Sequence, residues 1–363
     1  MVYLSGMNSP SPETTPTAYR LYDIAFRAIR SARIDRALDF VGGARGIIFA
    51  LHRVRPLQNQ AFRPNLGLEI TPAFLDAAIE HTKSRNLIFV SMDEALARLS
   101  ARDGQNFAVL TLDDGYRDTV EHALPILQKH GVPATVFVTS GFADRSAAVW
   151  WLTLEEAIRR APSVLFPDLD RITGFATDTP RRKQSAFEQI RALVTQHSPE
   201  AMRSAVFDIA MQAGISPNDI CEDACLNWNE ISALAKHPLI TIGAHTVSHP
   251  VLARCNPTEA MIEMARSRAA IEEQINSPVR HLAYPNGDTG SAGPREFSMA
   301  KALGFASAVT TRPGLIYTAH DQWMTALPRV SLNGFFQRIE QLDTMLTGAP
   351  FLLRNFGARL NVW

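Results

Sequence analysis

Seven short apolar runs, separated by stretches of helical periodicity, are the feature of this sequence that most restricts its fold. Short continuous apolar runs are typical of parallel strands that are buried on both faces, and their alternation with helices predicts an α/β fold. The runs lie at 46–51, 87–91, 107–112, 134–138, 239–244, 280–284 and 306–310. Their number favours a distorted, TIM-like (β/α)7–8 barrel, closed or nearly closed, over an open sheet.

One segment, residues 147–226, interrupts the alternation because it contains helical patterns and no convincing strand. The helical patterns lie near 153–160, 182–197 and 199–213. We therefore expect a helical insertion between two strands of a barrel domain that covers 46–335. A C-terminal helix and apolar tail, 336–363, should pack back against that domain.

The chain before the barrel divides into two segments. Residues 1–17 are polar and rich in Pro, Thr and Ser, which predicts a disordered tail. Residues 18–45 carry apolar side chains at helical spacing, which predicts an amphipathic helix. Between residues 16 and 60 there are 8 Arg against 3 Asp, a net charge of +5. One interpretation is a helix that packs on the barrel with a solvated basic face; the other is peripheral contact of residues 19–41 with a membrane or a partner.

Composition excludes several classes of protein. The 363 residues include 36 basic and 36 acidic side chains, so the overall positive field that favours nucleic-acid binding is absent. No uncharged apolar run reaches the ~18 residues of a membrane-spanning helix, and the N-terminus lacks the apolar centre of a signal peptide. Three cysteines do not support a disulfide framework. We expect a cytoplasmic protein, either free or held peripherally at a membrane.

Two adjacent carboxylates follow the third apolar run. Asp113 and Asp114 come directly after 107–112, and Gly115 then permits a sharp turn. In such a barrel the carboxyl ends of the strands and the loops after them build the active site. Adjacent carboxylates beside a buried strand are costly unless they hold a cation or share a proton. Asp-Asp-Gly is also a common turn, so this sequence alone is a weak signal.

Two histidines follow the fifth apolar run. His245 and His249 stand four residues apart in a segment that ends at Pro250, so both imidazoles can point to one place. One carboxylate and two imidazoles suit a divalent transition metal, most commonly zinc. Three protein ligands leave coordination positions open, which is typical of a catalytic site. Surface histidines are frequent, but the two clusters follow separate buried strands, and this favours a shared site.

These segments resemble the motifs of the NodB-type polysaccharide deacetylases. Residues 111–116 resemble the T-F-D-D-G motif, and residues 245–250 resemble the H-[ST]-x-x-H-P motif. Residues 282–287 resemble the F-A-Y-P-Y-G segment of an exopolysaccharide-related branch. Trp228 resembles the tryptophan ahead of the histidine strand, and His52 belongs to a segment similar to the Y-H-x-V start of that branch. The resemblance covers about 46–333 apart from the insertion.

The resemblance implies a metal-dependent hydrolase that acts on carbon–nitrogen bonds of linear amides other than peptides. Its substrate would be an N-acetylated sugar in a polysaccharide, an oligosaccharide or a lipid-linked precursor. By the same resemblance, Asp114, His245 and His249 would bind the metal, with zinc expected and cobalt, nickel or manganese as alternatives. Asp113 would be the general base that takes a proton from the attacking water.

Further roles also rest on the resemblance. The backbone N–H of Asn286 would donate to the oxyanion that forms from the N-acetyl carbonyl. Tyr116, Trp228 and Tyr284 would contact substrate. Trp150 and Trp151, at the start of the insertion, have two interpretations from the residues themselves: they stack on a sugar ring or pack in a core.

The sequence departs from the family pattern in two places. The last family motif, L-x-H, supplies the general acid, whereas here residues 327–330 read Leu-Pro-Arg-Val without a histidine. The arginine that begins the third motif is also missing, and Arg329 is our candidate to replace it. For the general acid we expect His52 first, with His281 and His320 as the next candidates.

Two other functions remain open at this stage. One is deformylation of a formamido-sugar lipid on the same scaffold, which the basic N-terminal helix would suit. The other is a non-catalytic carbohydrate-binding protein that retains the metal site and lacks the general acid.

Overall fold

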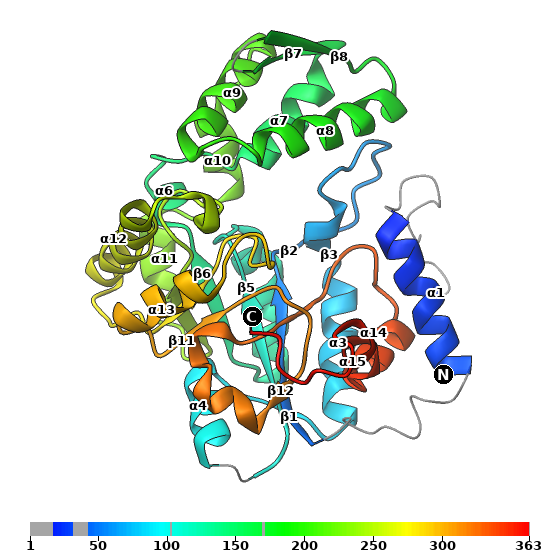
Figure 1. Cartoon of the computed structure of the whole chain (residues 1–363), viewed down its shortest axis with the longest axis vertical. Helices are drawn as coiled ribbons and strands as arrows, with labels where there is room; N and C mark the ends of the chain where they lie inside the picture. The colour runs from blue at the N-terminus through cyan, green and yellow to red at the C-terminus, as the bar shows by residue number, and fades with distance from the viewer. Residues whose placement is uncertain (1–16, 32–42, 102–103, 169–170, 363) are drawn as a thin grey trace.

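The computed structural model describes residues 17–31, 43–101, 104–168 and 171–362. Its main sheet has the order β11-β10-β9-β6-β5-β1-β12, with β13 paired to β1 and β4 paired to β5 (Figure 1). All seven apolar runs form strands of this sheet, and these seven strands are parallel to one another. They are β1 (Ala44–Leu51), β4 (Ile88–Phe89), β5 (Phe107–Leu112), β6 (Ala134–Val138), β9 (Ile240–Ala244), β10 (His281–Ala283) and β11 (Ser307–Val309).

The segment around β13 (Val330–Ser331) joins the two ends of this curled sheet. Leu327 forms a parallel bridge with Val309 of β11, and Val330 pairs in parallel with Phe49 of β1. The short β12 (Ile316–Tyr317) runs antiparallel to the start of β1. The α/β barrel expected from the alternation of apolar runs is therefore confirmed, and every parallel strand ends at the same edge.

Helices cover the outside of the barrel. Strand β3 (Glu69–Ile70) pairs with β2 (Arg53–Val54) and leads into helix α3, which begins at Pro72. The Thr71 hydroxyl caps this helix by accepting a hydrogen bond from the Phe74 N–H at 3.2 Å. The other covering elements are α4 (Met92–Ala101), η2 (Thr119–Ala123), α5 (Leu124–His130), α6 (Ser140–Ala143), α11 (Trp228–Leu234), α12 (Pro257–Ile275) and α13 (Pro294–Ala302); α3 ends at Ser84. Short 3-10 turns are η1 (Leu66–Leu68), η3 (Leu252–Arg254), η4 (Thr318–Gln322) and η5 (Met324–Ala326).

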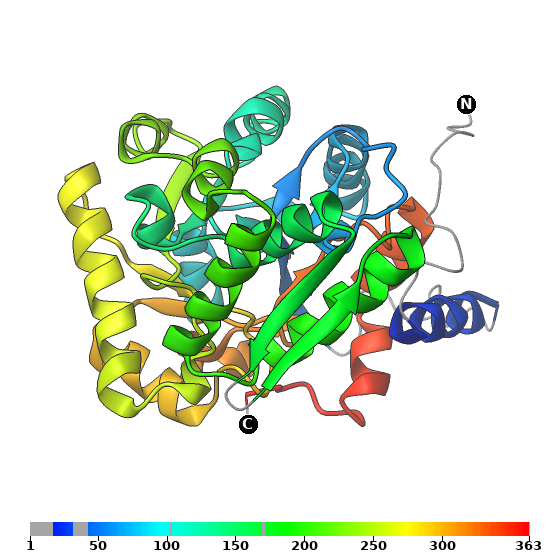
Figure 2. The same ribbon diagram turned by 90° about the horizontal axis from the view of Figure 1, so that it is seen from above.

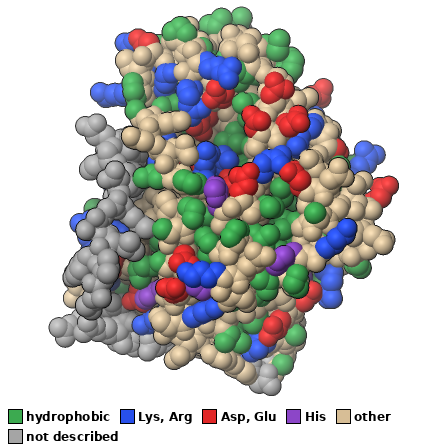
Figure 3. Space-filling model, turned by 180° about the vertical axis from the view of Figure 1, so that it is seen from behind, with side chains coloured by type: hydrophobic (Ala, Val, Ile, Leu, Met, Phe, Trp, Pro, Cys, Tyr) green, Lys and Arg blue, Asp and Glu red, His purple; other side chains and the backbone are tan. Residues whose placement is uncertain are grey.

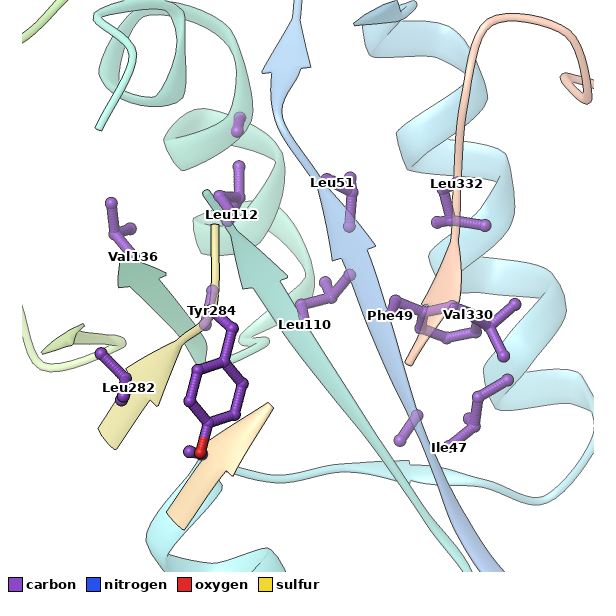
Figure 4. Close-up of a cluster of buried hydrophobic side chains, with 14 of the residues drawn as sticks. Ile47, Phe49, Leu51, Leu110, Leu112, Val136, Leu282, Tyr284, Val330 and Leu332 are labelled. Carbon is purple, nitrogen blue, oxygen red and sulfur yellow. The ribbon is translucent and has the colours of Figure 1, made fainter. Parts of the chain in front are cut away.

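The core fills the space between these helices and the sheet. Ile47, Phe49 and Leu51 alternate along β1 with side chains that face the other side, and all are buried. Figure 4 shows them beside Leu110 and Val330, which come from the neighbouring strands. The parallel strands are thus apolar on both faces, which is why the runs are continuous in sequence.

The insertion lies across the top of the barrel (Figures 1 and 2). It contains α7 (Trp150–Arg160), α8 (Pro180–Val194), α9 (Pro199–Gln212) and α10 (Pro217–Ala224), packed around a hydrophobic core of their own. The expectation of a segment without strands is wrong, because β7 (Ser163–Asp168) and β8 (Arg171–Ala176) form an antiparallel hairpin. Only one face of this hairpin is covered: Val164 and Phe166 are buried, whereas Leu165 is 49% exposed.

Helix α1 (Thr17–Ser31) packs against α14 (Ile339–Leu346) and α15 (Ala349–Arg354). Phe26 meets Phe336 at 5.3 Å between ring centroids, and Asp23 forms an ion pair with Arg338. The helix expected over 18–45 is therefore too long at its C-terminal end, because Ala44 already belongs to β1. Residues 32–42 and the tail at 1–16 lie outside the described residues. No helix among those described combines the length and apolar character needed to cross a membrane.

Candidate metal centre and active site

A cavity of about 340 Å³ lies between the insertion and the carboxyl ends of the barrel strands. Its wall contains the residues that follow several different strands: His52 after β1, Asp113 and Asp114 after β5, His245 and His249 after β9, and Asn286 after β10. The parallel strands thus bring together six candidate residues that are spread over most of the chain.

Asp114 and the two histidines converge on one point. The Oδ1 atom of Asp114 lies 3.4 Å from Nε2 of His245 and 3.5 Å from Nε2 of His249. One ligand atom of each residue lies within 4.8 Å of the other two. Among the described residues, Asp114 Oδ1 is a buried oxygen without a hydrogen-bond donor. A buried carboxylate oxygen beside two imidazole nitrogens fits a divalent cation, which would satisfy all three atoms.

The tautomer of His245 is determined by its other ring nitrogen. Nδ1 of His245 lies 2.7 Å from the Ala283 carbonyl oxygen, so in the neutral ring it carries the proton and Nε2 presents a lone pair toward Asp114. Burial acts to lower the pKa of His245, but the carboxylates of Asp114 and Asp113 outweigh it and raise that pKa. Burial lowers the pKa of His249 to about 4, which favours the neutral, metal-binding form of that ring.

The backbone at the site adopts conformations that side chains rarely take. Asp114, Thr246, His249 and Asn286 have φ angles of +73°, +65°, +55° and +58°, in the left-handed region. Such conformations cost about 1–3 kcal/mol each and persist only where the surroundings enforce them. Their concentration around one cavity is typical of a functional site.

Glu263 of α12 holds the loop between the two histidines. Its carboxylate accepts hydrogen bonds from the N–H groups of Val247 and Ser248, at 2.8 and 2.9 Å, and from the Ser248 hydroxyl at 2.7 Å. On the other side of the loop, the Gly141 N–H donates to the Val247 carbonyl at 2.9 Å, and a side chain at 141 would approach that oxygen to 2.5 Å. Sequence reasoning missed Glu263, because no motif marks it.

Asp113 is paired with Arg329 inside the barrel. The guanidinium donates to both carboxylate oxygens at 2.7 Å, and it also donates to the Thr310 carbonyl at 2.8 Å and the Thr111 hydroxyl at 3.0 Å. Burial acts to raise the pKa of Asp113, but the charge and hydrogen bonds of Arg329 outweigh it and keep that pKa below its usual range. Arg329 therefore makes the contact with the Asp113 carboxylate that we expected of a replacement for the missing arginine.

The three histidine candidates for the general acid lie in different environments. His52 lines the cavity together with the Asp-His-His cluster. His281 is fully buried at the start of β10, where it contacts Ser307 and Asp93. His320 is fully buried against the backbone of Tyr317. Neither His281 nor His320 lines the cavity, so His52 is the one of these three candidates that does.

Asn286 lines the cavity after the end of β10. Within the described part of the chain, its N–H donates no hydrogen bond, whereas its carbonyl accepts from the Thr311 hydroxyl at 2.5 Å. The tight turn here needs Gly287, whose φ is +66° and whose missing side chain would meet the Thr311 nitrogen at 2.7 Å. A backbone N–H at the cavity wall that has no acceptor within the described chain is suited to stabilise developing negative charge.

The structure does not place the three expected substrate contacts on the wall of the cavity. Tyr116 is fully buried, and its hydroxyl accepts from the Trp151 indole at 2.7 Å. Tyr284 is also fully buried; its hydroxyl donates to the Thr325 carbonyl at 2.8 Å, and Figure 4 shows its ring among core side chains. Trp228 packs at the edge of the main core and does not line the cavity.

Trp150 and Trp151 instead line the cavity, both from the first turn of α7. The ring of Trp151 lies 4.8 Å from the ring of His249, and Trp150 stands nearly perpendicular to Trp151 at 5.5 Å. Three polar side chains of α8, absent from our sequence-based candidates, line the same cavity: Gln184, Glu188 and Arg191. The insertion thus forms one wall of the site.

Comparison with known proteins identifies a family. The polysaccharide deacetylase family model matches residues 100–306, which is more than half of the chain. Among curated proteins, YxkH of Bacillus subtilis (strain 168), whose name assigns it to the polysaccharide deacetylases, is 29% identical over 108 residues. That match spans 30% of this chain and 37% of YxkH.

Solved structures share the fold at low sequence identity. The Streptococcus pyogenes deacetylase PplD, solved in complex with acetate, has a TM-score of 0.56 at 19% identity, covering 84% of this chain and 99% of PplD. IcaB from Ammonifex degensii has a TM-score of 0.54 at 16% identity, covering 84% and 98%. The de-N-acetylase from Aggregatibacter actinomycetemcomitans has a TM-score of 0.52 at 14% identity, covering 82% and 99%.

Proposed function

The chain belongs to the polysaccharide deacetylase family, and from that premise we propose that it hydrolyses N-acetyl groups of a sugar with the help of a divalent metal ion. The substrate is an N-acetylated polysaccharide, oligosaccharide or lipid-linked precursor, and zinc is the expected metal. Acetate is the small product of this reaction, and it is the molecule named in the complex of PplD.

One observation carries the proposal of a metal. Asp114 Oδ1 is buried, lacks a hydrogen-bond donor within the described chain, and lies within 3.5 Å of Nε2 of both His245 and His249. Hydrogen bonding to Ala283 directs the His245 lone pair to the same point. One oxygen and two nitrogen ligands suit zinc, cobalt, nickel or manganese. A divalent ion held there would supply Lewis-acid activation of water and of the amide carbonyl.

Asp113 is the proposed general base. It lies next to Asp114 at the cavity, and the Arg329 guanidinium keeps it ionised and fixes the plane of its carboxylate. Asp113 therefore can accept the proton of the attacking water without rotating away from it. Arg329 is fully buried and acts through its contact with Asp113, so it is a positioning residue.

The remaining steps use two other residues of the cavity wall, Asn286 and His52. The Asn286 N–H donates to the carbonyl oxygen as negative charge develops on it. His52 protonates the departing amine, because it is the histidine at the cavity that does not belong to the Asp-His-His cluster. The products are acetate and a free amino sugar.

The test is product analysis with metal-loaded protein. The protein is incubated with chito-oligosaccharides and bacterial exopolysaccharides, and acetate, formate and new amino groups are quantified, with Asp113→Asn as the inactive control. Acetate and amino groups released in equal amounts, by the wild type alone, support the proposal. Formate release would replace it with deformylation, and glycan binding without any release would replace it with a non-catalytic role.

A further inference from the structure

We propose that α8 of the insertion forms a subsite that binds the sugar next to the one that is deacetylated. The inference rests on the proposed function, and it adds that the substrate has at least two sugar units. It gives the insertion a role in substrate recognition.

The geometry of α8 places its polar side chains on the cavity. Gln184, Phe187, Glu188 and Arg191 follow the spacing i, i+3, i+4 and i+7, which places them on one face of the helix. All four line the cavity that contains Asp114 and the histidines. Phe187 is 2% exposed and meets Phe62 at 6.4 Å between ring centroids, so it anchors this face toward the barrel.

The chemistry of this face suits sugar hydroxyls, which both donate and accept hydrogen bonds. The Gln184 amide donates to one Glu188 oxygen at 2.9 Å, which orients both groups and leaves further donors and acceptors on each. Within the described residues, the Arg191 guanidinium has no ion pair or hydrogen bond. An amide, a carboxylate and a guanidinium thus offer hydrogen-bonding groups along one wall.

Trp150 and Trp151 lie between this wall and the cluster of Asp114, His245 and His249. Trp151 lies against His249, and Trp150 stands edge-on to Trp151 from the neighbouring position of α7. Trp150 is only partly buried, so its ring is available to the apolar face of a sugar. In Figure 3, acidic and basic side chains gather where the insertion meets the barrel. A sugar at the metal would therefore continue along Trp150 toward α8.

The test compares N-acetylglucosamine with its β-1,4-linked disaccharide and trisaccharide in metal-loaded enzyme. The variants are Gln184→Ala, Glu188→Ala and Arg191→Ala. The same helix provides matched controls, because Gln189 and Arg181 are exposed on α8 and do not line the cavity. Gln189→Ala and Arg181→Ala are therefore the matched controls for Gln184→Ala and Arg191→Ala, and both serve as the reference for Glu188→Ala.

We expect kcat/KM for the disaccharide to fall about tenfold in each cavity variant, as for a lost hydrogen bond to a charged or polar group. The value for the monosaccharide and the values of both controls should stay unchanged. Cavity variants that match their controls on the disaccharide would overturn the subsite. An equal fall on the monosaccharide would also overturn it, because the side chains would then serve the reacting sugar.

Binding separates this inference from the proposed function. Calorimetric titration of the trisaccharide into the Asp113→Asn protein, with and without each α8 substitution, measures the subsite without turnover. Weaker binding in the cavity variants alone supports the subsite even where no acetate is released, and the proposed function would then fail separately. Absence of binding by any of these sugars would overturn the subsite.

Discussion

Arg329 donates two hydrogen bonds of 2.7 Å to the Asp113 carboxylate, across 216 positions of sequence. The segment that contains Arg329 also joins β11 to β1, so the contact that closes the barrel delivers the guanidinium to the proposed base. The pair is fully buried, which makes each partner costly to remove without the other.

Replacing Arg329 should affect both stability and pH dependence. Arg329→Gln leaves Asp113 buried without its cation, at a cost of about 3–5 kcal/mol in the free energy of unfolding. Arg329 lowers the pKa of Asp113 against the effect of burial. The ion pair therefore stabilises the folded protein at pH values above the usual carboxyl pKa. That stabilisation is lost as the pH falls through the pKa that Asp113 has in the folded protein. In the variant that pKa rises, so the acid limb of kcat/KM should move to higher pH. A limb at unchanged pH would contradict the role of Arg329.

Asp113→Asn should separate catalysis from metal binding. The amide cannot accept the proton of water, so we expect turnover to fall ~10²-fold or more, while metal content by mass spectrometry stays near that of the wild type. Loss of the metal together with activity would show that Asp113 is a ligand.

His245→Ala and His249→Ala should lose both metal and turnover. Each removes a nitrogen that lies within 3.5 Å of Asp114 Oδ1, and two ligands do not hold a divalent ion well. His122→Ala, on η2 outside the cavity, is the matched control and should retain the wild-type metal content. Unchanged metal content in both cavity variants would refute the assigned ligands.

His52→Gln tests the proposed general acid. The glutamine keeps a polar side chain at the cavity and lacks an imidazole, so kcat should fall while metal affinity changes little. Measurement of kcat beside a metal titration separates the two effects. Wild-type kcat in this variant would remove His52 from the reaction.

Glu263→Gln tests how the histidine loop is held. The carboxylate accepts three hydrogen bonds from Val247 and Ser248, and an amide replaces one acceptor oxygen with a donor. We expect metal affinity to fall by about 10–100-fold, the usual effect of disturbing groups that orient ligands. Glu273→Gln, an exposed change on the same helix, should bind metal as the wild type does. Equal affinities in the two variants would show that the loop holds its shape without Glu263.

Local pattern was enough to predict the barrel and the cluster at its edge. The apolar runs specify strands buried on both faces, and the carboxyl ends of parallel strands lie together, so Asp114 and His245 had to be neighbours. The same argument put His52 at the cavity. It also explains why His281, at the start of its strand, lies away from the cavity.

Contacts that depend on packing were not predictable in the same way. Tyr116 and Tyr284 follow strands closely, yet their rings turn into the interior, and neighbouring side chains decide that orientation. Hairpin β7–β8 alternates buried and exposed residues over a short length that includes Pro167, so it lacks the continuous apolar run of the barrel strands. The approach of α8 to the cavity depends on how two separate cores meet, which no local pattern encodes.

Anomalous X-ray diffraction from crystals grown with zinc locates the metal independently of activity. Data collected above and below the zinc absorption edge should show one strong peak between Asp114 Oδ1 and the Nε2 atoms of His245 and His249. The other described group of suitable type, Asp76, Glu80 and His130, already has the Lys129 ammonium 2.6 Å from Asp76, and should show none. A peak at that second group, with none at the cavity, would contradict the assignment of Asp114, His245 and His249 as the metal ligands.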